Sequence, residues 1–151
     1  MAYWLLKSEP ESFSIDDLKR VEVEHWDGVR NYVARNNLRA MKKGELAFFY
    51  HSSTKPPGIA GICTVEREAY PDHTAFDPSS KYFDPKSSPG KPRWWMPDVR
   101  FVKKFPRLIP LDELRATPGL GEMALFTTRR LSVQPVTDKE WEIIVALAEQ
   151  A

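Results

Sequence analysis

The sequence predicts a single α+β domain built on a small mixed β-barrel of five to six strands with flanking helices. Five segments have the patterns of strands, helices follow the first strand and close the chain, and no β-α-β-α alternation is present. The chain has 151 residues, of which 42% are hydrophobic and 28% charged. A chain of this length and composition buries a core without disulfides or a structural metal, so we expect one domain over residues 1–151.

The predicted strands are short apolar or alternating runs bounded by turn residues, over residues 2–7, 45–51, 59–68, 93–105 and 131–135. The first ends at Ser8-Glu9-Pro10, because proline cannot continue the ladder of hydrogen bonds. The turn Pro56-Pro57-Gly58 joins the second and third runs into a predicted β-hairpin. Pro97 interrupts the fourth run and therefore predicts a bulge or an edge.

Capping signals mark the predicted helices. Ser14 with Asp17 opens a short helix that ends near Val21, and Thr137 with Glu140 opens the closing helix. Residues 31–41 have helical spacing and end in a basic turn before a glycine, and short helical turns are expected over 111–114 and 119–126. Residues 70–92 contain three turn-forming X-Pro pairs, which predict a long ordered loop of the kind that often carries function.

Basic residues are concentrated in two stretches, although the formal net charge is only +1. Residues 29–43 hold five basic side chains and no acidic one, and residues 81–107 hold eight basic and two acidic ones. Aromatic residues interleave with these charges, as on surfaces that hold phosphates with cations and stack on bases. The same pattern also arises where basic residues alternate with core residues on an amphipathic strand or helix.

The sequence contains none of the common short motifs for nucleotide binding, zinc proteolysis or serine hydrolysis. His25, His51 and His73 lie on different predicted elements, and the lone Cys63 excludes a disulfide framework. We therefore expect no cofactor and no metal. No run approaches the ~18 apolar residues of a membrane span, and the first residues lack the regions of a signal peptide. We expect a cytoplasmic monomer without a membrane partner.

Two segments bring polar and aromatic groups to the ends of predicted elements. The first segment is Lys7-Ser8-Glu9 at a strand end, and it has three interpretations. Its polar groups would bind the edge of a planar nucleobase, or Lys7 with Ser8 or Glu9 would form a nucleophile and a general base, or the charges would simply be solvated. Trp26 precedes a glycine turn that opens the arginine-bearing helix, which places an aromatic wall, free amides and the Arg30 cation together. This arrangement suits a nucleotide, and a core position of Trp26 under the helix is the alternative.

Six motifs closely resemble the EVE domain family: Y-W-L-L-K-S-E-P at 3–10, W-D-G-V-R-N-Y-V-A-R-N at 26–36, F-Y-H-S at 49–52, P-P-G-I-A-G at 56–61, Y-P-D-H-T-A-F-D-P at 70–78 and R-L-S-V-Q-P at 130–135. They span nearly the whole chain, which implies one EVE domain over residues 1–151. The resemblance implies a PUA-like fold, a β-barrel with flanking helices related to YTH and ASCH domains. It also implies binding of DNA or RNA, often through a modified base held by aromatic side chains.

A weaker resemblance to YTH readers implies which residues hold the base. Their strand end is similar to Lys7-Ser8, their first cage tryptophan falls near Trp26, and their second falls in a stretch similar to residues 94–100. Neighbours on a strand face opposite sides, so one of Trp94 and Trp95 is expected in the pocket. On that basis Ser8 and Asn31 would read the edge of the base. Together with the segments singled out above, the predicted ligand-binding residues are Lys7, Ser8, Glu9, Trp26, Val29, Arg30, Asn31, Tyr50, His51, Trp94 and Trp95. From the basic stretches, the predicted contacts to the nucleic-acid backbone are Arg35, Arg39, Lys86 and Arg93, with Arg30 as a further phosphate ligand.

The expected function is that of a non-catalytic module that reads a methylated or hydroxymethylated base in DNA or RNA. One alternative is a small hydrolase, because some ASCH relatives cleave amides of modified nucleosides with a lysine and a carboxylate, as Lys7 and Glu9 would. The other alternative is a sensor of a free nucleotide or small anionic metabolite. Such a sensor gains no affinity from a longer oligonucleotide.

Overall fold

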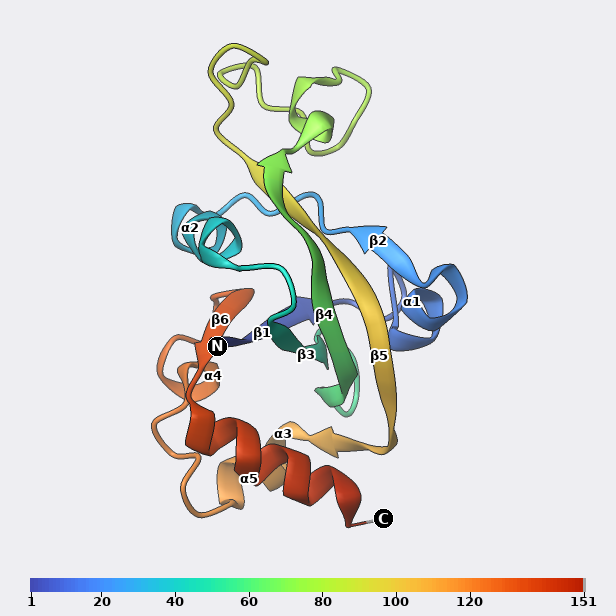
Figure 1. Cartoon of the computed structure of the whole chain (residues 1–151), viewed down its shortest axis with the longest axis vertical. Helices are drawn as coiled ribbons and strands as arrows, with labels where there is room; N and C mark the ends of the chain where they lie inside the picture. Colours follow the sequence, from blue (N-terminus) through green and yellow to red (C-terminus); the bar gives the residue numbers. More distant parts are fainter. Residues whose placement is uncertain (151) are drawn as a thin grey trace.

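The computed structural model describes residues 1–150 and contains one six-stranded mixed sheet with flanking helices (Figure 1). The strands are β1 (Tyr3–Ser8), β2 (Val23–His25), β3 (Leu46–His51), β4 (Gly58–Pro71), β5 (Trp95–Pro110) and β6 (Val133–Val136). The helices are α1 (Ile15–Val21), α2 (Tyr32–Ala40), the 3₁₀ helix η1 (His73–Phe76), α3 (Leu111–Ala116), α4 (Ala124–Thr127) and α5 (Asp138–Glu149). The strand order is β2-β5-β4-β3-β1-β6, in which β1 and β3 run parallel and the other neighbours antiparallel.

The α+β class, the β3–β4 hairpin and the five predicted strands are confirmed. The short strand β2 was not predicted, because three residues of mixed polarity give no periodic signal. The closure into a barrel is not shown, since β2 and β6 lie at opposite ends of the strand order and are not paired with each other in residues 1–150. The capping boxes of α1 and α5 are present as predicted, and Asn31 caps α2.

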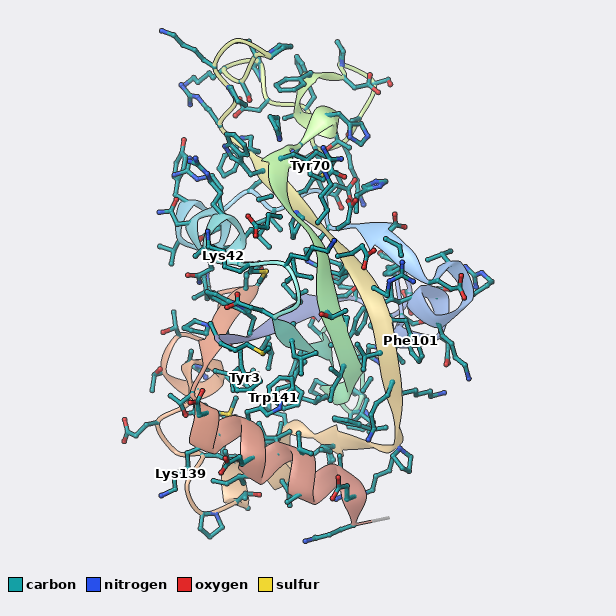
Figure 2. The ribbon with its side chains drawn as sticks, viewed as in Figure 1. Tyr3, Lys42, Tyr70, Phe101, Lys139 and Trp141 are labelled. Carbon is teal, nitrogen blue, oxygen red and sulfur yellow. The ribbon has the colours of Figure 1, made fainter. Side chains whose placement is uncertain are left out.

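The strands β4 and β5 form a long twisted ribbon that extends beyond the rest of the sheet (Figure 1). Their register shifts at several places, one of them between Arg67 and Tyr70, which pair with Asp98 and Met96. Pro97 lies inside this irregularity, so the predicted bulge is confirmed. The far end of the ribbon, near Tyr70 in Figure 2, carries the long loop that was predicted over residues 70–92. In the structure the loop covers residues 72–94, because β4 continues to Pro71 and β5 begins at Trp95.

Side chains alternate along the central strands and build two apolar clusters on opposite faces of the sheet. Leu6 and Phe49 belong to the cluster that packs against α1, α2 and Trp26. Leu5 and Phe48 belong to the cluster under α5. In the second cluster Tyr3 stacks on Trp141 of α5, with ring centroids 4.4 Å apart (Figure 2). Within residues 1–150, no helix has the length and apolar character needed to cross a membrane.

Candidate functional site

A cleft of about 710 Å³ opens where β1 ends, beside β2 and the segment that follows it. Its volume lies in the range of small-molecule binding sites. The cleft brings together the two segments singled out in the sequence, although they are about 20 residues apart. The lining residues are Lys7, Ser8, Glu9, Ser12 and Phe13 from the β1 side, Glu24, His25, Trp26, Asp27, Gly28, Val29 and Arg30 from β2 onward, and Lys81, Tyr82 and Ser132.

Trp26 is both a core residue and part of the cleft wall. Only 8% of its surface is exposed, and its ring meets Phe49 and Phe13 edge to face, at centroid distances of 5.5 and 6.4 Å. Its backbone N–H donates to the carbonyl of Pro97 at 2.9 Å, which ties this segment to β5. The packing fixes the indole in place, so a ligand in the cleft meets a rigid aromatic surface.

Tyr82, which we did not predict as a site residue, forms another aromatic part of the wall. It packs against Gly28, whose φ of +81° lies in the left-handed region. A Cβ at Gly28 would lie 2.6 Å from the Tyr82 ring, so this contact requires glycine. The signal for Tyr82 in the sequence was its place in the long loop within the basic stretch. The loop therefore folds back from the end of the ribbon to complete the cleft.

Asp72 holds the loop to the segment that precedes α2. Its side chain has no exposed surface, and it accepts hydrogen bonds from Gly28 N–H at 2.9 Å, Arg30 Nη1 at 3.0 Å and Thr74 N–H at 2.9 Å. The Thr74 hydroxyl also donates to Asp72, at 2.6 Å. Burial on its own would raise the pKa of Asp72, but the hydrogen bonds, with that of the Thr74 hydroxyl the strongest, outweigh burial and lower the pKa below its ordinary value. Arg30 also donates to the carbonyl of Tyr82 at 3.1 and 2.8 Å. Its guanidinium thus binds the loop, rather than being free for a phosphate as the sequence led us to expect.

Contacts within the protein also occupy the polar groups at the end of β1. The Lys7 ammonium donates to the carbonyl of Arg129 at 2.6 Å, and burial lowers the pKa of Lys7. The Ser8 hydroxyl donates to the carbonyl of Phe13 at 2.5 Å. Over the described part of the chain, Lys7 makes no hydrogen bond or ion pair with Ser8 or Glu9, so the nucleophile–base contact of the hydrolase alternative is not formed.

Asn31, Tyr50 and His51 do not line this cleft, contrary to expectation. The side chain of Asn31 caps α2 by accepting from the N–H of Ala34 at 2.9 Å. Tyr50 follows Phe49 on β3 and therefore points to the other face of the sheet, into the cluster under α5. His51 Nε2 accepts from the N–H of Ile15 at 3.1 Å, and burial lowers the pKa of His51.

Trp94 and Trp95 also lie outside the cleft, on a separate surface that we call the α2 surface and define as Tyr32, Arg35, Arg39, Trp94 and Trp95. Trp94 is buried and stacks on Tyr32, with ring centroids 4.9 Å apart. Its Nε1 donates to the carboxylate of Asp84 in the loop at 2.7 Å. Arg35 lies 4.8 Å from the Tyr32 ring and Arg39 lies 4.3 Å from the Trp95 ring. Neither tryptophan faces Trp26 across the cleft, because each packs on α2 side chains instead.

The two remaining predicted phosphate ligands lie in or beside the loop. The Lys86 side chain is exposed, and the carbonyl of Arg93 accepts from Arg35 Nη1 at 3.0 Å, which places Arg93 next to the α2 surface. In residues 1–150 the structure forms no group of three or more His, Cys, Asp or Glu side chains that would hold a metal ion.

Comparisons with known proteins agree with this architecture. Residues 2–147 match the EVE domain. Human thymocyte nuclear protein 1 is 50% identical over 168 residues, which cover 99% of this chain and 75% of that protein. A hypothetical protein from Leishmania major has a structure that superposes with a TM-score of 0.96 at 53% identity, covering 99% of this chain and 96% of that one.

Two further structures extend the comparison. The structure of the human THYN1 protein in complex with DNA containing 5-methylcytosine superposes with a TM-score of 0.94 at 49% identity, covering 100% of this chain and 99% of that one. An ASCH protein from Zymomonas mobilis superposes with a TM-score of 0.52 at 12% identity, covering 96% of this chain and 97% of that one, which is a likeness of fold alone. The match over residues 2–147 and these identities show that the chain belongs to the EVE domain family.

Proposed function

We propose that this protein is a non-catalytic module that binds DNA containing a modified cytosine, with 5-methylcytosine as the first candidate, and that the base enters the cleft beside Trp26. One observation carries the proposal, namely the similarity along the whole chain to the human THYN1 protein, whose structure holds DNA with 5-methylcytosine. The cleft supports the proposal because its volume of about 710 Å³ admits a nucleotide.

The chemistry of the cleft fits a flipped cytosine. Proteins that extrude a base hold it by stacking on aromatic side chains and by hydrogen bonds to its edge. Trp26 and Tyr82 supply the aromatic surfaces. The carboxylates of Glu9 and Asp27 also line the cleft, and a carboxylate can accept a hydrogen bond from the exocyclic amino group of cytosine.

The α2 surface supports a role in contacting the nucleic-acid backbone. Arg35 and Arg39 project from the same helix, and Tyr32 beside them is 51% exposed. None of the ion pairs within residues 1–150 involves either arginine, so both charges remain uncompensated by a carboxylate. We assign to them the phosphate contacts that hold the duplex while the base occupies the cleft, with Lys86 and Arg93 as neighbouring cations.

The experiment compares binding of matched duplexes that carry cytosine, 5-methylcytosine or 5-hydroxymethylcytosine, with RNA and N6-methyladenine duplexes alongside, at two salt concentrations. We expect Trp26→Ala to abolish the preference for the modified base and to leave the salt-dependent background, since stacking contributes roughly 1–3 kcal/mol per base. Trp26→Phe, which keeps an aromatic core residue, controls for destabilisation. Equal losses for modified and plain duplexes would contradict the assignment of the cleft.

Arg39→Gln is the matched test of the backbone contacts. It should weaken binding to all duplexes by a similar factor. It should also reduce the slope of log affinity against log salt concentration by about 1, the value for one phosphate contact. Arg20→Gln, an exposed arginine on α1, serves as the control and should leave binding unchanged. A loss that depends on the modified base would place Arg39 in base recognition instead.

A further inference from the structure

A second, smaller cavity of about 160 Å³ lies on the α5 side of the sheet and shares Lys7 with the cleft. Tyr50 and Ser52 from the end of β3 line it, together with Arg115 at the end of α3 and Arg129 after α4. Leucines from α3 and α4 complete its wall. The cavity is well below the roughly 300–1,000 Å³ of sites for larger ligands, so it suits a small group.

The charge of this cavity is entirely positive. Lys7, Arg115 and Arg129 line it, and no carboxylate does. Arg115 contacts Asp112 at 3.3 Å, but that carboxylate is 95% exposed and lies outside the cavity. Through the described residues 1–150, Lys7 and Arg129 form no ion pair with any carboxylate. Three cations around one cavity, two of them without a carboxylate partner, attract an anion.

The hydroxyl of Tyr50 provides an independent indication of a ligand. Tyr50 is only 4% exposed, yet its hydroxyl makes no hydrogen bond to the part of the protein that the structure describes. Tyr50 lines the cavity, so its hydroxyl is a free hydrogen-bond donor at the cavity wall. Burial raises the pKa of Tyr50, so the group remains a donor at neutral pH. An acceptor oxygen in the cavity would satisfy it.

We propose that this second cavity is a binding site for a phosphate group, held by Lys7, Arg115 and Arg129 and by the hydroxyls of Tyr50 and Ser52. The ammonium supplies a point charge and the guanidinium groups supply paired donors, which together match the oxygens of a phosphate. The phosphate comes either from a free ligand, such as inorganic phosphate or a mononucleotide, or from a nucleic-acid backbone. The site stands on its own residues and does not require the base-binding role of the cleft.

The test titrates inorganic phosphate into the intact protein at constant ionic strength, with chloride as the reference anion, and follows amide chemical shifts by NMR together with the melting temperature. We expect shifts at residues around Tyr50 and Arg129 and a rise in melting temperature. Arg129→Gln and Tyr50→Phe should each weaken phosphate binding roughly tenfold, because each removes a hydrogen bond to a charged ligand. The matched control is Arg130→Gln, which removes an exposed neighbouring arginine that does not line the cavity.

Two results would overturn the proposal: phosphate binding that all three variants weaken equally, and the absence of any saturable shift at residues of the cavity. Tyr50→Phe also guards against misfolding, since it keeps the packed ring and removes only the unpartnered hydroxyl.

A second arm identifies the source of the phosphate. If the group belongs to a nucleic-acid backbone, an oligonucleotide displaces inorganic phosphate and Arg129→Gln lowers the salt dependence of its binding. If it belongs to a free ligand, a nucleoside monophosphate binds, the nucleoside does not, and the oligonucleotide leaves phosphate bound. Trp26→Ala removes base preference in either case, so failure of the cleft assignment and failure of the phosphate site are separately visible.

Discussion

Replacing Asp72 by asparagine should loosen the loop over the cleft and lower the free energy of unfolding by about 3 kcal/mol. The Asp72 carboxylate has no exposed surface and accepts from Gly28, Arg30 and Thr74. Asparagine retains one acceptor oxygen for Thr74, but its amide nitrogen then meets the donors of Gly28 and Arg30, which share Oδ2. Removing one partner of a buried ion pair costs roughly 3–5 kcal/mol, and the 22% exposure of Arg30 places this case at the lower end.

Urea unfolding followed by tryptophan fluorescence measures this loss directly. For a domain of this size about 1 kcal/mol corresponds to roughly 2–4 °C, so the melting temperature should fall by about 6–12 °C. The matched control is Asp77→Asn in the same loop, where the carboxylate accepts from Ser79 at 2.9 and 2.7 Å on the surface without a cation. That change should cost less than about 1 kcal/mol. Similar losses in the two variants would refute the view that Asp72 anchors the loop.

The pH dependence of the Asp72 variant has a definite sign. The folded-state pKa of Asp72 lies below the ordinary value of 3.8, because its hydrogen bonds outweigh burial. Its contribution to stability is therefore complete above pH 3.8 and is lost as the pH falls through the folded-state pKa. The difference between the wild type and Asp72→Asn should shrink in that acidic range and stay constant at neutral pH.

Gly28→Ala should lower the free energy of unfolding in urea by about 2 kcal/mol, because an L-residue is disfavoured at φ +81° and its Cβ would lie 2.6 Å from the Tyr82 ring. The control Gly121→Ala has open space around it and should leave the stability unchanged. Equal effects of the two changes would exclude the packing of Tyr82 as the cause. The Cys63 thiol, whose pKa burial raises to about 12, should resist a thiol reagent at mildly alkaline pH until urea unfolds the protein, and rapid modification of the native protein would contradict its burial. Burial lowers the pKa of His51 below 6.5, so its contribution to the free energy of unfolding should be complete above pH 6.5 and decline as the pH falls toward the folded-state pKa. In unfolding experiments at several pH values, His51→Gln should abolish this dependence on pH. An unchanged dependence would exclude His51 as its source.

The sequence predicted those elements whose signals are local. The caps at Ser14 and Thr137 lie within one turn of the helices they begin, so the boundaries of α1 and α5 follow from a few adjacent residues. The cleft segments, Lys7 to Glu9 and Trp26 to Arg30, were likewise predicted because polar and aromatic groups cluster at the ends of elements. The structure confirms that these segments meet.

The rest depends on contacts between distant parts of the chain. Asp72 lies 42 residues from Arg30, and no pattern near either residue marks the pair. Tyr50 could be assigned to a face only after the packing of Phe49 against Trp26 was known, since a strand alternates its side chains but does not say which set faces the ligand. One of Trp94 and Trp95 was predicted in the cleft by resemblance, whereas the stacking of Trp94 on Tyr32 depends on where α2 lies.

The position of β1 also bears on how the protein is made. During synthesis β1 emerges before the other strands of this domain. Its parallel partner β3 follows about 40 residues later, whereas its other partner, β6, is complete only at Val136. Until then one edge of β1 remains open, and its residues Trp4, Leu5 and Leu6, buried in the finished fold, are available to other chains. A chain terminated before β6 would have an exposed apolar strand edge. The strand β6 thus protects β1, more than 100 residues before it, from aggregation.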